Sequence, residues 1–215
     1  MNYMENIFVC LAAPILLAGL CLRGARRKGY MAFFLLGMTA CLLSSYISSF
    51  MAMAIGADAL TASVEVSPIV EEAMKFMPAL FYLMVFEPNN ESSLNSIVLI
   101  SAGFATFENV CYLIENGASS ISHLLIRGLC TGAMHIVCGM IVAWGIYYLW
   151  DRAYLRTVGT VGLIAVAIIY HGVYNVLVSQ HGVAAAIGYA IPLCTAILVY
   201  YISVTIEKGG NAAEA

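Results

Sequence analysis

Residues 157–179 read TVGTVGLIAVAIIYHGVYNVLVS, a stretch of 23 residues that contains no Asp, Glu, Lys or Arg. A helix needs about 20 mostly apolar residues to cross the hydrocarbon core of a bilayer. The stretch therefore predicts one membrane-spanning helix. Two polar residues, His171 and Asn175, fall inside this span four positions apart, so they share one face of the helix.

The rest of the chain has the same character as this stretch. Its 215 residues are 62% hydrophobic and only 10% charged, with a mean hydropathy of +0.92, whereas soluble domains carry roughly a quarter charged residues. We expect an all-α polytopic membrane protein with about seven transmembrane helices. The predicted spans are 5–22, 30–55, 68–86, 94–114, 119–149, 157–179 and 183–205.

The basic residues of the connections all fall on one side of this predicted topology. Because Lys and Arg gather on the cytoplasmic side of a membrane, we expect the N-terminus outside and the C-terminus in the cytoplasm of a bacterial-type plasma membrane. Positive charges follow the first apolar run instead of preceding it, so this run is predicted to be a retained span and not a cleaved signal peptide. The basic residues of the inner connections are Arg23, Arg26, Arg27, Lys28, Arg152, Arg156 and Lys208.

The predicted spans follow one another with short gaps, which leaves no room for a separate soluble domain. We expect a single transmembrane domain over residues 1–208 and a short disordered tail over residues 209–215. The lipid bilayer is the expected surrounding, and no nucleic-acid partner is expected. The seven cysteines fall in apolar stretches and form no CxxC pair, so they predict neither a disulfide framework nor a thiolate zinc site.

Charged and polar side chains interrupt the predicted spans. An ionised side chain at the centre of a membrane helix costs roughly 2.5–3.5 kcal/mol on insertion scales. Such residues therefore face the interior of a bundle, pair with one another and mark a functional site. The residues of this kind are Glu71, Glu72, Lys75, Glu108, Arg127, His135, His171 and Asn175.

These polar residues are predicted to lie at one level. Ser67 and Pro68 suit the N-cap and the first position of a helix, so the acidic pair that follows them would lie in its first two turns. Adjacent spans run in opposite directions, which brings the polar residues of four successive spans into the outer half of the membrane. Four separate helices thus contribute to one predicted site.

Spacing along the helices also predicts contacts. Glu71 and Lys75 are four residues apart and form a predicted ion pair. Gly128 and Gly132 form a GxxxG pattern, which predicts that a neighbouring helix approaches closely at these two positions.

Three short motifs occur in order on successive spans, EEAMK at 71–75, FATFE at 104–108 and HGVYN at 171–175. As EExxK, FxxxE and HxxxN, they resemble the motifs of the PrsW family of glutamic-type intramembrane proteases, which is related to the CAAX protease and bacteriocin-processing (CPBP) superfamily. The resemblance covers about residues 67–180 and implies that they are the catalytic core.

The resemblance also implies roles for individual residues. Position 139, four residues after His135, is Gly in place of the Asn or Asp of a second motif. The implied catalytic residues are Glu71, Glu72, Glu108, His171 and Asn175. The implied supporting residues are Lys75, Phe104, Arg127 and His135.

The same residues suit peptide hydrolysis, which needs an activated water, a group that stabilises the oxyanion and a proton for the leaving amine. A carboxylate in a low-dielectric site can act as base and then as acid. Glu71 and Glu108 are expected to share a proton because two like charges repel. The expected oxyanion donors are His171 and Asn175, and the two intramembrane cations, Lys75 and Arg127, would balance the carboxylates.

No metal cofactor is expected for a glutamic-type enzyme, and the sequence contains no HExxH zinc motif. A metal-dependent variant stays open, because carboxylate and imidazole ligands suit zinc and other first-row divalent metals. The ligand set of that variant would be Glu71, Glu108, His135 and His171.

The predicted substrate is a single-span membrane protein or the leader of a secreted peptide, cut near the extracytoplasmic edge of the membrane. The family resemblance implies that this substrate is an anti-sigma factor. Two alternatives remain open. One is a non-catalytic membrane scaffold or immunity-type protein of the same fold; the other is a small proton-coupled carrier whose buried Glu, Lys and His relay protons.

Overall fold

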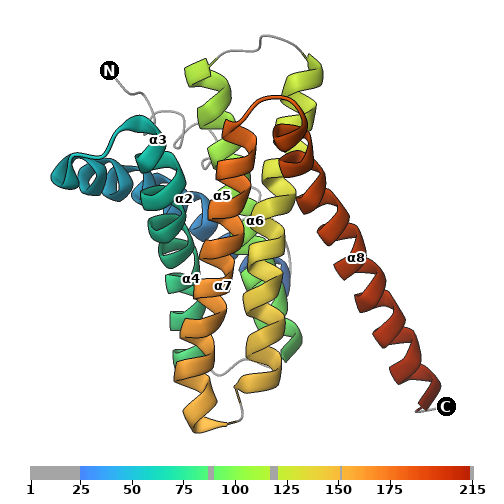
Figure 1. Cartoon of the computed structure of the whole chain (residues 1–215). Helices are drawn as coiled ribbons and strands as arrows, with labels where there is room; N and C mark the ends of the chain where they lie inside the picture. The colour runs from blue at the N-terminus through green and yellow to red at the C-terminus, as the bar shows by residue number, and fades with distance from the viewer. Residues whose placement is uncertain (1–24, 87–89, 117–120, 151, 214–215) are drawn as a thin grey trace.

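The computed structural model of the chain describes residues 25–86, 90–116, 121–150 and 152–213. Every regular element in these residues is helical, and no strand occurs among them, which confirms the all-α prediction. The helices, labelled as in Figure 1, are α2 (Ala25–Ile55), α3 (Ala59–Thr61), the π-helical turn η1 (Ala62–Val66), α4 (Ser67–Phe86), α5 (Asn90–Asn116), α6 (Ile121–Leu149), α7 (Ala153–Ser179) and α8 (Val183–Ala213).

Five helical segments are long and apolar enough to cross a membrane, which supports a multi-pass membrane protein. The 20-residue helix α4 is not one of the five, and it carries three charged side chains. The predicted span 5–22 lies outside the described residues, so the count of seven spans and the orientation of the termini stay predictions. The five segments are Gly29–Ile55, Ser92–Glu115, Leu125–Ile146, Tyr154–Ser179 and Val183–Tyr201.

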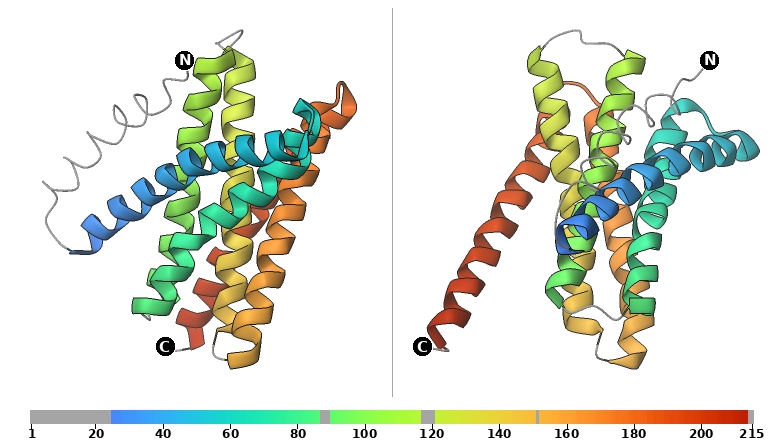
Figure 2. Two further views of the ribbon diagram at one scale, coloured as in Figure 1. Left: turned by 90° about the vertical axis from the view of Figure 1, so that its left-hand side faces the viewer. Right: turned by 180° about the vertical axis from the view of Figure 1, so that it is seen from behind.

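Helices α4, α5, α6 and α7 lie alongside one another and form the bundle that carries the polar residues (Figure 1). Helix α2 crosses this bundle obliquely and packs on α4 and α5 (Figure 2). Helix α8 packs on α6 and α7 near its start, and its C-terminal end stands away from the bundle (Figure 1). It continues to Ala213, into the segment predicted as a tail.

The crossing of α2 and α5 is a close backbone contact made possible by two glycines. A Cβ atom on Gly37 would overlap the carbonyl of Ile100, and one on Gly103 would overlap the carbonyl of Phe34. The close approach predicted at the GxxxG of α6 is wrong for the described part of the chain, because a Cβ atom on either of its glycines meets no described atom within 4 Å.

Helix α4 begins earlier than its sequence suggests. The predicted N-cap Ser67 is in the α-helical conformation, and the helical backbone already begins at α3, where the Asp58 carboxylate accepts a hydrogen bond of 2.7 Å from the Thr61 N–H. The prediction of Ser67 as the cap is therefore wrong. Pro68 has no N–H to donate to the Val64 carbonyl, which disfavours the ordinary α-helical register at this point. The turn η1 widens the register just before α4.

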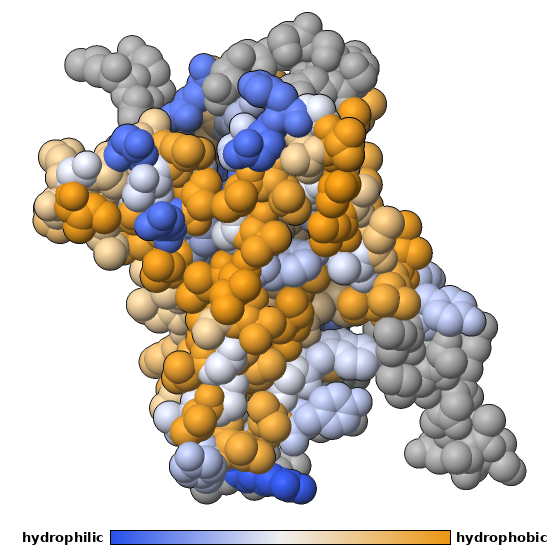
Figure 3. All heavy atoms as spheres, in the orientation of Figure 1, coloured by the Kyte–Doolittle hydropathy of each residue, from blue (hydrophilic) through white to orange (hydrophobic). Residues whose placement is uncertain are grey.

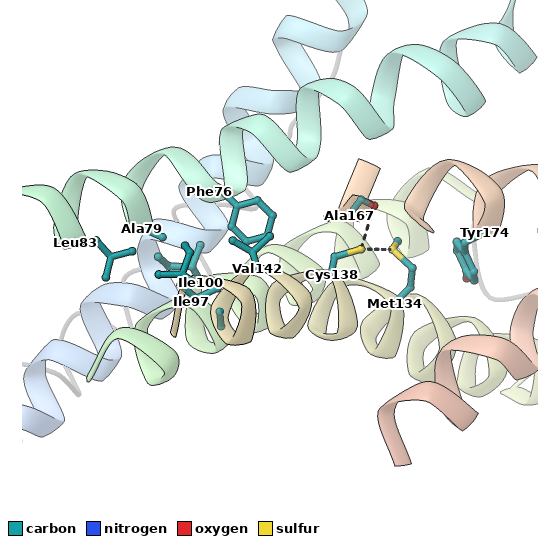
Figure 4. Packing of buried hydrophobic residues seen from close by; sticks show 12 residues of the cluster. Phe76, Ala79, Leu83, Ile97, Ile100, Met134, Cys138, Val142, Ala167 and Tyr174 are labelled. Atoms are coloured by element: carbon teal, nitrogen blue, oxygen red, sulfur yellow. Dashed lines mark hydrogen bonds between the residues drawn. The ribbon is translucent and has the colours of Figure 1, made fainter. Parts of the chain in front are cut away.

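An apolar core fills the centre of the bundle between α4, α5, α6 and α7. Figure 4 shows side chains from these helices converging on it, with the Cys138 thiol donating to the Ala167 carbonyl at 3.5 Å. The face of the molecule seen in Figure 3 is also mostly apolar across its middle, with hydrophilic residues mainly toward its upper and lower parts, as expected for a protein that lies in lipid. The polar residues predicted from sequence lie next to this core, inside the bundle.

Candidate active site

The structure brings the polar residues of four helices together. Helix α4 contributes Glu71, Glu72 and Lys75, and the other three helices contribute the remaining predicted residues. Three side chains at the centre, those of Glu72, Lys75 and His135, are 0% exposed. The residues from the other helices are Phe104 and Glu108 of α5, Arg127 and His135 of α6, and His171 and Asn175 of α7.

A buried ion pair lies at the base of the cluster. Lys75 Nζ is 2.6 Å from Glu72 Oε2 and 2.8 Å from Glu72 Oε1. Lys75 therefore pairs with Glu72, three residues before it. The predicted ion pair with Glu71 is wrong. Its ammonium group also lies 5.5 Å from the centre of the Phe104 ring, within cation–π distance. This ion pair keeps the Glu72 carboxylate charged and fixed in position.

Glu72 holds the ring of His171. The His171 Nδ1–H donates to Glu72 Oε1 at 2.8 Å, and in the neutral imidazole Nε2 then keeps its lone pair. That second nitrogen lies 3.7 Å from Glu71 Oε2. A carboxylate behind one nitrogen of a histidine is the arrangement that orients histidine ligands of metals. The neighbouring glutamates thus differ in role, since one fixes the imidazole and the other faces it.

His135 occupies the centre of the cluster. Its Nδ1 accepts from Lys75 Nζ at 3.4 Å, and its Nε2 contacts the carboxylate of Glu108. Its ring centre lies 5.0 Å from the ring centres of Phe104 and of His171. This histidine was predicted as a supporting residue and as a ligand of the metal-dependent variant, and it contacts the polar residues of three other helices.

Arg127 lies at the edge of the cluster beside Glu108. Its Nη2 is 3.7 Å from Glu108 Oε1, and its Nη1 donates to the Thr131 hydroxyl at 3.2 Å. The guanidinium carbon stacks 3.3 Å from the centre of the Tyr112 ring. The buried Nε–H has no hydrogen-bond partner among the described atoms, so the arginine retains a donor for a further polar group.

Asn175 is tied to the wide turn before α4. Its Nδ2 donates to the Ser63 carbonyl at 2.9 Å, and Ser63 belongs to η1. The amide therefore satisfies a carbonyl in a stretch where the α-helical register is interrupted. Its predicted role as an oxyanion donor stays a prediction.

Two cavities adjoin the cluster, of about 210 and 330 Å³. Glu71, Glu108, Tyr112 and Arg127 line both of them. The side chains of Glu71 and Glu108 are 18% and 26% exposed, whereas that of Glu72 is fully buried. A water molecule or a peptide that enters these cavities would therefore meet Glu71 and Glu108, and would not meet Glu72.

Three donor groups of the cluster suit a metal ion. Glu71, His135 and His171 each offer one ligand atom, and these atoms lie within 4.8 Å of one another. Two imidazoles and a carboxylate are the protein ligands of many catalytic zinc sites. Glu72 behind His171 accepts the proton of the second ring nitrogen, which also fits a metal centre.

A family model described as "PrsW family intramembrane metalloprotease" matches residues 26–206. The chain belongs to the PrsW family. The resemblance inferred from the three motifs is thereby confirmed, and the chain is a multi-pass intramembrane protease by family. Neither the curated proteins nor the solved structures include a match to it.

The PrsW site also contains residues that the sequence did not reveal. Helix α2 places Cys41, Ser44 and Ser45 in the smaller cavity. On α7, the Tyr174 hydroxyl lies 2.7 Å from the Thr131 hydroxyl, at the wall of the larger cavity. The recurrence of small polar residues at positions 41, 44, 45 and 48 of one apolar helix is the signal that could have identified the α2 wall.

Proposed function

We propose that this PrsW-family protein is a metal-dependent intramembrane peptidase. The observation that carries the proposal is the placement of Glu71, His135 and His171, whose donor atoms converge within the bundle. The family description and the donor set both favour the metal-dependent variant over the metal-free glutamic type that the sequence led us to expect. The finer assignment of roles below rests on the contacts of each side chain.

A divalent ion such as zinc would be held by Glu71, His135 and His171. When bound, it would act as a Lewis acid toward the scissile carbonyl and make a water molecule more acidic. The imidazole of His171 is ready to bind, because Glu72 accepts its Nδ1 proton and Nε2 keeps its lone pair. A neutral His135 has one nitrogen lone pair and one N–H. A metal on this ring would therefore replace the contact of one nitrogen, with Lys75 at Nδ1 or with Glu108 at Nε2, and the other nitrogen would keep its proton.

Glu108 is the residue we assign to proton transfer. It is the carboxylate next to the three donors, it lines both cavities, and its side chain is partly exposed. It would take a proton from the attacking water and return it to the leaving amine, as a carboxylate in a site of low dielectric can do. Arg127, which is held beside it, lines both cavities, and its guanidinium group would orient the substrate carbonyl.

Glu72 and Lys75 are assigned a positioning role. Both are fully buried and paired with each other, so neither faces the cavities. Their contacts fix the two histidine rings, and the loss of such outer contacts typically lowers metal affinity or activity 10- to 100-fold. Phe104 packs on His135 from the side and keeps water from that face of the ring.

The proposed substrate is a single-span membrane protein, such as an anti-sigma factor, or the leader of a secreted peptide. A site inside a bundle of membrane-crossing helices suits a substrate that is itself in the membrane. The polar residues lie in the first turns of α4 and the last turns of α7, so cutting is expected near one edge of the cell membrane.

The proposal can be tested by co-expressing the protein with a panel of single-span membrane proteins that carry a tag at each end. We expect the wild type to cut one member of the panel. The control variant Glu65→Gln, at an exposed residue outside the site, should cut the same protein. Glu71→Gln and Glu108→Gln should leave it intact. A chelator should stop cleavage by the purified wild type, and zinc should restore it.

Cleavage by Glu71→Gln at the wild-type rate would contradict the proposed site. Cleavage that resists chelation would contradict the metal and favour the glutamic type. A panel member that co-purifies uncut with the wild type would favour a scaffold protein.

A further inference from the structure

A third cavity lies far from the site, between the C-terminal half of α4 and the N-terminal half of α7. Its volume is about 340 Å³. It reaches the end of the bundle where Leu149 ends α6 and Ala153 begins α7. The lining residues are Leu80, Leu83, Met84, Trp150, Arg156, Thr157, Thr160, Val161 and Ile164.

The cavity is polar at one end and apolar along the rest of its length. Arg156, Thr157 and Trp150 stand at the end of the bundle, whereas Val161 and Ile164 follow along α7 toward its middle. Eight residues of helix separate Arg156 from Ile164, which is about 12 Å along the axis. A cation at the end of the bundle, followed by an apolar wall toward its middle, suits an amphiphile whose tail points toward the centre of the membrane.

Arg156 is held in place for a ligand at this end. Its Nε donates to the Trp150 carbonyl at 3.0 Å, and its guanidinium carbon lies 5.0 Å from the centre of the Trp150 ring. Its side chain is exposed and lines the cavity. A planar guanidinium whose position is fixed suits bidentate recognition of a phosphate group.

The charge and the apolar lining of the cavity favour an anionic lipid. A volume of about 340 Å³ can accept part of an extended acyl chain. Basic pockets between transmembrane helices on the cytoplasmic side bind anionic head groups.

We propose that this cavity binds one anionic phospholipid, with its phosphate on Arg156 and an acyl chain against Val161 and Ile164. The site does not involve the residues assigned to peptide hydrolysis. The larger apolar cavity of about 620 Å³ between α2 and α4 provides a contrast, because no charged residue lines it and nothing there would select a head group.

Native mass spectrometry of the purified full chain tests the proposal. The protein is released from detergent in the presence of equal amounts of phosphatidylglycerol and phosphatidylcholine with the same acyl chains. We expect preferential retention of phosphatidylglycerol, about fivefold, since one basic residue near an anionic head group contributes roughly that factor. Arg156→Gln should abolish the preference, and Arg152→Gln, an exposed residue of the same connection that does not line the cavity, should keep it.

A second pair of variants tests the acyl chain. Val161→Trp places a large ring in the cavity at a residue that is 64% exposed, so the fold should tolerate it. It should reduce the retention of both lipids, while Val158→Trp, on the same helix but outside the cavity, should not. Equal losses in Arg156→Gln and Arg152→Gln would overturn the proposal, as would equal effects of the two Trp variants or displacement of phosphatidylglycerol by inorganic phosphate.

Discussion

The substitution Lys75→Met tests the buried ion pair that underlies the site. Lys75 and Glu72 are both 0% exposed, and the ammonium lies 2.6 Å from a carboxylate oxygen. Methionine keeps most of the side-chain volume but leaves Glu72 as a buried anion with only the His171 N–H beside it. Removing one partner of a buried pair costs about 3–5 kcal/mol, mainly because the remaining charge is uncompensated.

Thermal unfolding in detergent measures this cost. Each kcal/mol shifts the midpoint by about 2–4 °C for a protein of this size, so Lys75→Met should unfold roughly 6–20 °C below the wild type. The double variant Glu72→Gln with Lys75→Met should recover most of the loss, since it removes both charges and the new amide carbonyl still accepts from His171. The exposed-site control Glu65→Gln should unfold with the wild type. A single variant as stable as the wild type, or a double variant less stable than the single one, would refute the reasoning.

Three further substitutions have expected outcomes. Gly103→Ala should destabilise the protein by about 1–3 kcal/mol, because its Cβ meets a backbone carbonyl that cannot rotate away. Gly132→Ala should not destabilise it, because a Cβ atom there meets nothing within 4 Å. Unfolding in detergent compares the two variants. Asn175→Asp keeps the shape but loses the N–H that bonds the Ser63 carbonyl, so a loss of about 1 kcal/mol or more is expected in the same assay, and an unchanged midpoint would contradict the contact. Glu108→Gln should lower the cleavage rate by roughly 10²–10⁴-fold without reducing the metal content, as for loss of a general base.

The helices and their polar residues could be predicted from the sequence for simple reasons. Apolar runs of about 20 residues leave few options other than membrane helices, and the bounds found for α4 to α7 lie within a few residues of those expected. Because successive helices run in opposite directions, the position of a residue along its helix also gives its depth in the membrane. The convergence of Glu71, Glu108, His135 and His171 follows from that depth and from the need of polar side chains in lipid to face the interior of a bundle.

The choice of partners within the cluster could not be predicted. Seen along the helix axis, Lys75 is about 40° from Glu71 and about 60° from Glu72, so helical geometry alone does not select one. The contact with His171, on a helix about 100 residues further along the chain, fixes Glu72 behind the ring and leaves Glu71 to face the cavities. Such a choice depends on how α4 and α7 pack.

The position of α2 also could not be predicted from the sequence. A GxxxG pattern predicted a close approach on α6, but the close approach occurs where two isolated glycines, Gly37 and Gly103, face backbone carbonyls of the partner helix. Neither glycine is distinguished by its own surroundings in the sequence. The oblique crossing that they permit brings Ser44 and Ser45 into the wall of the site.

The metal content of the purified protein tests the central claim most directly. We expect about one divalent ion per chain in the wild type and in Glu108→Gln. We expect a large loss of that metal in Glu71→Gln and in His171→Ala, which remove donors of the proposed centre. A wild type that holds no divalent metal after reconstitution with zinc, or variants that hold as much as the wild type, would contradict a metal centre at Glu71, His135 and His171.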